Sequence, residues 1–386
     1  MNNDKQFGIV GLAALLVINI PSVKLFVGVT SIVNAIALMG LIGAALVRLY
    51  PNLHTLKNRD GGVLLFGVWL LTMLIALPEH VLVRSIESGH VSSTIKTFYT
   101  VACMAAVVLS ARARDVHMLV MGQIVWGVFV AVCFLMGWVH YSDAESLHYN
   151  TITLPLALST LSAIACWAES KSLSTPNKFL LALVIAINVL GILNLFGRSP
   201  FIFIVIIVLS SYIVKRKSAI KKAVYSVKAL MYISIAIVVS SFLISRLNIE
   251  INFHVFSRMS DLVEGGDLRI SIYAEAIRFI SNNPFGYGWG AYEQMSTLSP
   301  YPHNIILEVG ITAGLLGVIL IVSLLLFYLN RILIYYHTVN RRLAMQSAYM
   351  SLYFVFTFMV SYSITSSYML FVSVCMSTAI PLCKGK

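Results

Sequence analysis

Charged residues are scarce in this chain: they make up 11% of its 386 residues, and only 15 residues are acidic. Apolar residues account for 59% of the sequence, and the mean hydropathy is +0.88. Only helices and closed barrels satisfy their backbone hydrogen bonds in lipid, and the apolar runs here are continuous rather than alternating, which excludes a barrel. The sequence therefore predicts an all-α, polytopic integral membrane protein.

Several kinds of chemistry lack their sequence motifs. The five cysteines all lie within or at the end of apolar runs and form no Cys-x-x-C pair, which predicts buried thiols rather than disulfides. The four histidines near one predicted membrane face lack the spacing of metal ligands; they are His80, His90, His140 and His148. There is no Asp-x-Asp pair, and no glycine-rich loop follows a predicted strand. We therefore expect no metal, no nucleotide and no other cofactor.

Twelve apolar segments are candidates for membrane-spanning helices. They are residues 7–20, 25–50, 62–77, 95–110, 117–138, 149–168, 179–197, 199–214, 226–244, 303–329, 343–361 and 364–383. A short break at Gly197 to Pro200 alone separates the seventh segment from the eighth, and Pro200 suits the first turn of a new helix.

The basic residues orient these segments. If the N-terminus is cytoplasmic, 19 of the 27 lysines and arginines fall on the cytoplasmic side, whereas the opposite orientation leaves eight there. Because basic residues concentrate in cytoplasmic loops, the first arrangement is favoured. Both termini are then cytoplasmic, and the longest loop, 245–302, faces the periplasm or the cell exterior. The net charge of +12 is mainly a topology signal, so we expect no nucleic-acid partner.

The eight basic residues on the outer side need another explanation, and six of them are arginines. They are Lys24, Arg84, Lys96, Arg198, Arg246, Arg258, Arg269 and Arg278. A guanidinium group binds phosphate through two parallel hydrogen bonds and keeps its charge, so these arginines favour an anionic ligand. Salt bridges with acidic residues of the outer loops are an equally good explanation for Arg84, Arg246 and Arg258.

Within the long loop, residues 267–281 have the pattern of an amphipathic helix. Asp267 is the expected N-cap, and an Asn-Asn-Pro sequence ends the pattern. Arg269 and Tyr273 share one face of this helix, whereas Arg278 lies about 180° away from Arg269. We therefore predict that Arg269, near the helix N-terminus, contacts phosphate and that Arg278 has a structural role.

A glycine-rich aromatic loop, PFGYGWG, occupies residues 284–290. Its three alternating glycines permit a close backbone approach, and its aromatic residues suit either a membrane interface or stacking on a sugar ring.

His303 and Asn304 then begin an apolar helix in which three glycines allow tight packing. A single histidine at a membrane boundary is commonly interfacial, but its place after the arginines favours a functional role. Glu308 lies about 140° around the helix and is not expected to orient His303.

Arg198 stands apart, because it lies between two apolar runs with no acidic residue within twenty positions. An arginine near lipid is costly unless it faces a polar cavity or an anion. Its side chain is therefore expected to meet a ligand, with extension to the outer membrane surface as the alternative.

Three short motifs, in this order, resemble the O-antigen ligase/polymerase family of bacterial envelope glycosyltransferases. The first is Gly197-Arg198-Ser199, in the middle of the chain. The second is a helix that begins at Arg269 and ends in Pro284-Phe285-Gly286-Tyr287-Gly288. The third is His303-Asn304-x-x-Leu307-Glu308-x-Gly310. Residues 1–190 match this family only in their general apolar character.

The resemblance implies a GT-C-like membrane glycosyltransferase with about 12 transmembrane helices. Its parts would be a scaffold of about nine helices (1–244), a periplasmic catalytic loop with amphipathic helices (245–302) and about three C-terminal helices (303–386). It would act at the periplasmic face of the bacterial inner membrane on a glycan carried by undecaprenyl pyrophosphate. A chain-length regulator and a flippase are candidate partners beside the lipid bilayer.

The resemblance also implies a set of site residues. His303, Arg269 and Arg198 are the expected catalytic residues, with the arginines neutralising the pyrophosphate and His303 acting as a base or as a hydrogen-bond donor. The expected substrate-binding residues are Asn304, Tyr273, Arg278, Tyr287 and Trp289; the resemblance thus adds substrate binding to the structural role that helix geometry predicts for Arg278. No metal site is expected.

Three functions remain open from the sequence. The acceptor can be another lipid-linked repeat, as in a polymerase, or lipid A-core, as in a ligase. We favour the polymerase because the modest outer loops leave little surface for docking a bulky lipid A-core. A transporter or flippase of lipid-linked glycan would need basic residues along a path between both faces, whereas the candidate arginines lie at one face.

Overall fold

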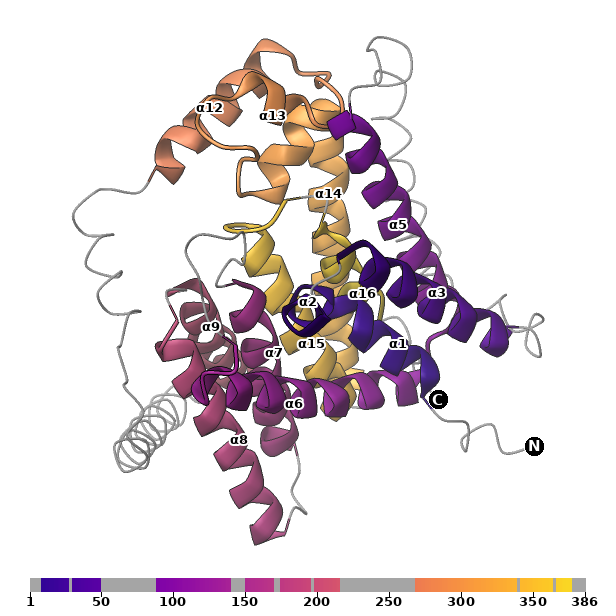
Figure 1. Ribbon diagram of the computed structural model, residues 1–386, viewed down its shortest axis with the longest axis vertical. Coiled ribbons are helices and arrows are strands. Elements are labelled where there is room, and N and C mark those ends of the chain that lie inside the picture. The colour runs from indigo at the N-terminus through magenta and orange to yellow at the C-terminus, as the bar shows by residue number, and fades with distance from the viewer. Residues whose placement is uncertain are drawn as a thin grey trace. The chain divides into compact units, whose positions relative to one another are not determined.

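The computed structural model describes residues 8–27, 30–49, 88–139, 150–169, 174–195, 198–215, 268–338, 341–363 and 366–376 (Figure 1). The regular elements within these ranges are all helices. They are α1 (Ile9–Ile18), α2 (Ile20–Val27), α3 (Thr30–Leu49), α5 (Ser88–Ser110), α6 (Ala113–Leu135), α7 (Asn150–Glu169), α8 (Thr175–Leu193), α9 (Arg198–Lys215), α12 (Arg269–Asn282), α13 (Ala291–Met295), α14 (Ile305–Thr338), α15 (Arg341–Phe358) and α16 (Tyr368–Met376). The predicted all-α class is confirmed.

Four described helices are long and apolar enough to cross a membrane. They are Ala113–Leu135, Asn150–Ala168, Pro176–Leu193 and Ile305–Tyr328, and the bent pair α1 and α2 would add a fifth. These helices support a multi-pass membrane protein. The expected number of twelve spans is not confirmed, and the predicted segments 62–77 and 226–244 lie outside the described residues.

The helix boundaries agree with the prediction at one break and differ from it at another. The predicted break near Gly197 is confirmed, because α8 ends at Leu193 and α9 begins at Arg198 with Pro200 in its first turn. At the N-terminus, the gap between the apolar segments 7–20 and 25–50 is helical, because α2 covers Ile20–Val27. Here α1 ends at Ile18 and α2 begins at Ile20, so only Asn19 separates the two helices.

The chain divides into two compact units. The first comprises Met1–Ile18, Ser31–Met118 and Asp267–Lys386, and the second comprises Asn19–Thr30 and Leu119–Gly266. These units are not the three parts expected from the sequence, whose division into scaffold, loop and C-terminal helices stays a prediction.

Buried side-chain hydrogen bonds organise the second unit. Asn19 and Gln123 exchange amide hydrogen bonds of 2.7 and 3.3 Å, and Gln123 also donates to the carbonyl of Pro155 inside α7. Asn188 of α8 donates to Ser159 Oγ of α7 at 3.0 Å. Because polar groups shielded from water are costly unless they are paired, these bonds fix the helices of this unit in register.

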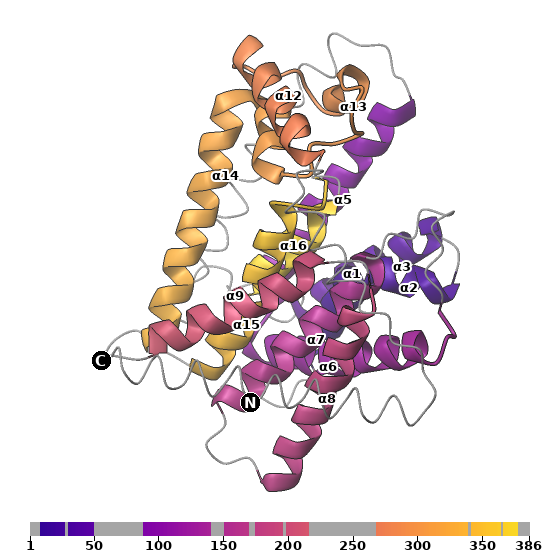
Figure 2. The same ribbon diagram turned by 90° about the vertical axis from the view of Figure 1, so that its left-hand side faces the viewer.

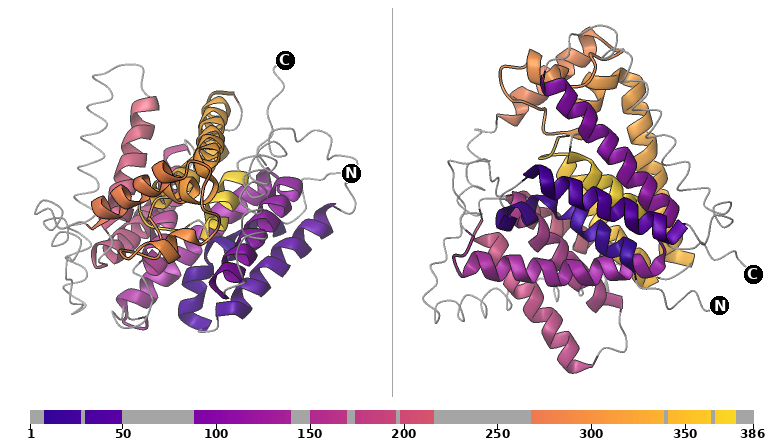
Figure 3. Two further views of the ribbon diagram at one scale, coloured as in Figure 1. Left: turned by 90° about the horizontal axis from the view of Figure 1, so that it is seen from above. Right: turned by 45° about the vertical axis from the view of Figure 1, so that its right-hand side comes forward.

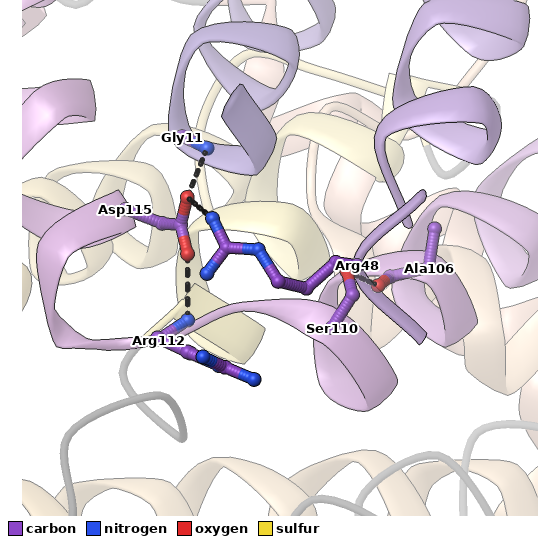
Figure 4. Close-up of polar contacts among 6 residues, drawn as sticks. All are labelled: Gly11, Arg48, Ala106, Ser110, Arg112 and Asp115. Atoms are coloured by element: carbon purple, nitrogen blue, oxygen red, sulfur yellow. Dashed lines mark hydrogen bonds and ion pairs between the residues drawn. The ribbon is translucent and has the colours of Figure 1, made fainter. Parts of the chain in front are cut away.

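A buried carboxylate joins α1, α3 and the first turns of α6 within the first unit (Figure 4). Asp115, near the start of α6, accepts hydrogen bonds from the backbone N–H of Gly11 in α1 (3.1 Å) and of Arg112 (2.8 Å). The guanidinium of Arg48, at the end of α3, lies 3.5 Å from the same carboxylate, and both side chains are buried. Gly11 is required here, because a Cβ atom would lie 2.1 Å from the carbonyl oxygen of Asp115.

Candidate functional site

The helix predicted at 267–281 forms and packs with its neighbours into a small apolar core. Here α12 runs from Arg269 to Asn282, so the expected stop at the Asn-Asn-Pro sequence is confirmed; the expected N-cap, Asp267, lies outside the described residues. Figures 1 and 2 show α12 and α13 at the same end of α14, and the three orange helices remain together in Figure 3. The buried members of this core are Ile272, Ala276, Tyr292 and Ile311.

A carboxylate ties α13 to α12. Tyr292 and Ser296 both donate hydrogen bonds from their hydroxyl groups to Glu275 Oε2. Burial raises the pKa of Tyr292, so its hydroxyl stays protonated and remains a donor at neutral pH. This cluster holds the loop after α13 in place, and that loop leads directly to His303.

The glycine-rich loop forms backbone hydrogen bonds to α14 at a point where that helix is interrupted. Gly314 has φ +68° and ψ −165°, which interrupts the helix. The N–H groups of Tyr287 and Gly288 donate to the carbonyls of Ile311 (2.7 Å) and Thr312 (3.0 Å), and the N–H of Leu315 donates to Pro284 (2.8 Å). The loop therefore supplies hydrogen bonds that the helix loses at its break.

Two glycines make this backbone contact possible. A Cβ atom at Gly286 would lie 2.6 Å from the backbone nitrogen of Gly314, and one at Gly314 would lie 2.1 Å from the carbonyl oxygen of Pro284. Both residues also have positive φ angles. The alternating glycines were predicted to permit a close backbone approach. In the structure, they bring the backbone of the glycine-rich loop against α14.

His303 has an unusual backbone conformation immediately before α14. Its φ is +54°, and among the described residues no other non-glycine residue has a positive φ. The left-handed region costs a residue with a Cβ atom about 1 kcal/mol or more, and such conformations concentrate at functional sites. The half-buried imidazole lies between the ring of Tyr301, at 4.2 Å between centroids, and the turn that follows α15.

The contacts of the imidazole define which nitrogen holds its proton. Nδ1 lies 3.3 Å from the carbonyl oxygen of Ser361, which can only accept, so Nδ1 carries a hydrogen. Nε2 lies 3.3 Å from Ser299 Oγ, which also contacts the carbonyl of Tyr301 at 2.9 Å. If the Ser299 hydroxyl donates to Nε2, the imidazole is neutral. If the Ser299 hydroxyl instead donates to the carbonyl of Tyr301, its oxygen can accept a hydrogen from Nε2. The site therefore accommodates both the neutral imidazole and the imidazolium.

The residues of the third motif bind alternate positions of one short segment, residues 359–363. Asn304 Nδ2 donates to the carbonyl of Met359 at 3.1 Å, and Ser363 Oγ donates to Glu308 Oε1 at 2.9 Å. The His303 contact with Ser361 lies between these two. Asn304 also caps α14, because its Oδ1 accepts hydrogen bonds from two N–H groups of the first turn.

Tyr273 brings α12 to the same segment. Its hydroxyl lies 3.4 Å from the carbonyl of Met359, which also accepts from Asn304. Arg269 is one turn earlier in α12 and about 40° from Tyr273 around the helix, so both side chains extend from the face that packs against α14. The structure therefore places Tyr273 and Asn304 together at 359–363, with Arg269 on the adjoining turn.

The other predicted binding residues lie in different surroundings. Tyr287 is half-buried and packs edge to face on Phe279 at 6.3 Å, and Trp289 is buried, with 3% of its surface exposed. Arg278 is exposed, with its guanidinium carbon 5.7 Å from the ring centre of Phe279. Their predicted contacts with substrate stay predictions.

Arg198 is the first residue of α9 and belongs to the second unit, whereas Arg269 and His303 belong to the first. Its predicted place in one site with Arg269 and His303 stays a prediction. Among the described residues, no group of three or more histidine, cysteine or acidic side chains could hold a metal ion.

The serines around His303 were not predicted. Ser299, Ser361 and Ser363 contact the site, but serine is common in loops and no spacing in the sequence distinguishes them. Glu308 was not expected to orient His303, and the structure connects it through Ser363 to the segment that His303 contacts.

The described helices define a multi-pass, all-α membrane protein with a polar cluster at one end of its longest helix. A family model described as O-Antigen ligase matches residues 181–322. The predicted resemblance is therefore confirmed for this part of the chain, which contains Arg198, Arg269 and His303. No curated protein matches the chain.

Proposed function

We propose that this protein is a membrane glycosyltransferase that joins oligosaccharide repeats carried on undecaprenyl pyrophosphate at the outer face of the bacterial inner membrane. The observation that carries the proposal is the arrangement of His303. Its strained backbone and its Nδ1 contact with Ser361 direct Nε2 away from the turn, as a general base requires. The family match over 181–322 supports a reaction of this type.

The proposed reaction is a displacement at the anomeric carbon of the donor sugar. The oxygen of an acceptor hydroxyl bonds to that carbon, the bond from the carbon to the pyrophosphate oxygen breaks, and the electron pair leaves with undecaprenyl pyrophosphate. The acceptor proton passes to His303 Nε2. Arg269 and Arg198 balance the charge that develops on the pyrophosphate, the role for which guanidinium groups are well suited.

Ser299 fits this reaction as the hydrogen-bond partner of His303 Nε2 before the acceptor substrate binds. Its hydroxyl has an alternative acceptor in the carbonyl of Tyr301, so the acceptor hydroxyl can take its place without leaving Ser299 unpaired. Asn304 and Tyr273 both contact the carbonyl of Met359, two residues before the Ser361 carbonyl that faces Nδ1.

Deletion of the gene in its host tests the proposed function. For a polymerase, deletion leaves single repeats on lipid A-core, because ligation continues without elongation. Complementation with His303→Ala, Arg269→Ala or Arg198→Ala should fail to restore long chains, although each variant inserts into the membrane at the wild-type level. His117→Ala, in α6, is the matched control and should restore them. Long chains of normal length in all three variants would refute the proposal.

The ligase is the second candidate, because the matching family model is described as O-Antigen ligase. In that case the deletion strain would accumulate full-length polymer on undecaprenyl pyrophosphate and none on lipid A-core. The same gel therefore distinguishes the two acceptors. If the protein in vesicles moves lipid-linked glycan across the membrane without elongating or transferring it, the transporter would be favoured instead.

A further inference from the structure

The helix α12 has a second apolar face, which points away from its packed core. Ile270 and Ile277 lie seven residues apart, within about 20° of each other around the helix, and they are 73% and 55% exposed. Ala274 and Ser281 lie between and beyond them on the same face. The acid of this helix, Glu275, instead bonds to Tyr292 and Ser296 within the packed core.

This face continues into the exposed side of α14. Phe285, just after α12, is 89% exposed, and the carbonyl of its neighbour Pro284 accepts a hydrogen bond from the N–H of Leu315. Leu315 and Leu316 are half exposed on α14, which is apolar enough to cross a membrane. Phe285 is therefore level with the first exposed leucines after the break in α14.

The composition of α14 indicates what surrounds this level. The part of α14 that is long and apolar enough to cross a membrane is Ile305–Tyr328, and it includes the break at Gly314 as well as Leu315 and Leu316. Phe285 therefore lies beside the exposed surface of a candidate membrane span. Apolar side chains exposed there are expected to contact lipid.

We propose that the outer face of α12, together with Phe285, is a lipid-binding surface. In this arrangement α12 lies along the membrane boundary, with Ile270, Ile277 and Phe285 in contact with acyl chains. Arg278, exposed beside this face, is available to lipid phosphates. The proposal is independent of the reaction catalysed. It would hold Arg269, which lies about 100° around the helix from Ile270, at the edge of this surface and close to the headgroup layer.

Tryptophan fluorescence tests this surface in the full-length protein. Ile277→Trp, Phe285→Trp and the control Glu293→Trp, at an exposed position of α13, are placed in nanodiscs of phosphatidylethanolamine and phosphatidylglycerol. The signal of the added tryptophan is its difference from the wild-type protein. At residues 277 and 285, lipids brominated near the glycerol end should quench this signal at least twofold more strongly than at residue 293, and aqueous iodide should quench it less.

Two results would overturn the proposal. Quenching by iodide at 277 and 285 to the same extent as at 293 would show that this face meets water. Protection from both quenchers would show that protein covers it. Because Phe285→Trp exchanges one exposed aromatic side chain for another, it tests the surface even if Ile277→Trp accumulates poorly. No enzymatic activity is needed, so failure of the proposed function would not alter the outcome.

Discussion

The hydroxyl of Ser363 donates a hydrogen bond of 2.9 Å to the carboxylate of Glu308, two residues beyond the carbonyl that faces Nδ1 of His303. Glu308 is itself buried, and its backbone carbonyl accepts from Thr312 Oγ1 in the next turn of α14. The carboxylate thus fixes the 359–363 segment against the helix that begins beside His303. We infer from this relationship that Glu308 is a positioning residue for the imidazole.

We expect Glu308→Ala and Ser363→Ala to have similar effects on glycan transfer. Each should lower kcat about 10-fold to 100-fold with little change in KM, because the imidazole loses its fixed orientation while the binding side chains remain. The double variant should be no slower than the slower single variant, since both remove the same contact. The measurement is transfer by purified protein in proteoliposomes.

Conservative substitutions provide the controls for this pair. Ser363→Thr keeps the hydroxyl and should retain most of the activity. Ser361→Ala should behave like the wild type, because the contact with His303 is made by the backbone carbonyl of residue 361. A fully active Ser363→Ala combined with an inactive Glu308→Ala would show that Glu308 acts by another route.

Two substitutions of His303 can separate the effect of losing the imidazole from the effect of the strained, left-handed backbone. His303→Ala and His303→Gly should both lower the transfer rate by at least about 100-fold, since each removes the proposed base. His303→Gly should nevertheless be more stable than His303→Ala by about 1 kcal/mol, because glycine adopts a φ of +54° without a Cβ clash. Thermal unfolding in detergent measures this difference. Equal stability of the two variants would mean that residue 303 stores no strain.

Local signals in the sequence predicted the elements that carry the site. The Asn-Asn-Pro sequence ended α12 as expected, and the predicted re-entry at His303-Asn304 coincides with the start of α14, where Asn304 caps the helix. Proline and capping residues act within a few positions of where they stand, so their effects can be read without tertiary contacts.

Contacts between distant parts of the chain determined what the sequence did not reveal. Gly314 lies in an apolar run and resembles a packing glycine, but the loop at Pro284, thirty residues earlier, stabilises a break there. The break between α1 and α2 is at Asn19, which is hydrogen-bonded to Gln123, 104 residues away. Ser361 and Ser363 likewise contact residues 58 and 55 positions away. Contacts between residues so far apart in the chain leave no periodic pattern in the local sequence from which they could be predicted.

Gly314→Ala should disrupt the contact between the glycine-rich loop and α14. Its Cβ atom would lie 2.1 Å from the carbonyl of Pro284, and its φ of +68° is unfavourable for alanine. We expect a loss of about 2 kcal/mol or more in the free energy of unfolding, together with reduced transfer activity. Gly43→Ala is the matched control, because it lies in helix α3 with no atom within 4 Å of the added carbon. Equal melting temperatures of the two variants would contradict the role assigned to Gly314.

Asp115→Asn should destabilise the first unit through the helices that its carboxylate joins. The substitution leaves the buried guanidinium of Arg48 without its charge partner, and breaking a buried ion pair costs about 3 to 5 kcal/mol. It also replaces one of the oxygens that accept from the N–H groups of Gly11 and Arg112 with an amide donor. The expected result is a clear fall in the temperature of unfolding in detergent.

A second substitution distinguishes the loss of the pair from a general defect at Asp115. Arg48→Met in the Asp115→Asn background removes the buried charge that has lost the Asp115 carboxylate and should recover part of the lost stability, because an apolar side chain of similar length tolerates burial better than a cation does. Arg114→Met, at an exposed position near the same turn, should leave the melting temperature within about 1 °C of the wild type, since surface charges contribute little. If the double variant is less stable than Asp115→Asn alone, Arg48 contributes through packing of its aliphatic stem, and the ion pair is not the main source of stability at this junction.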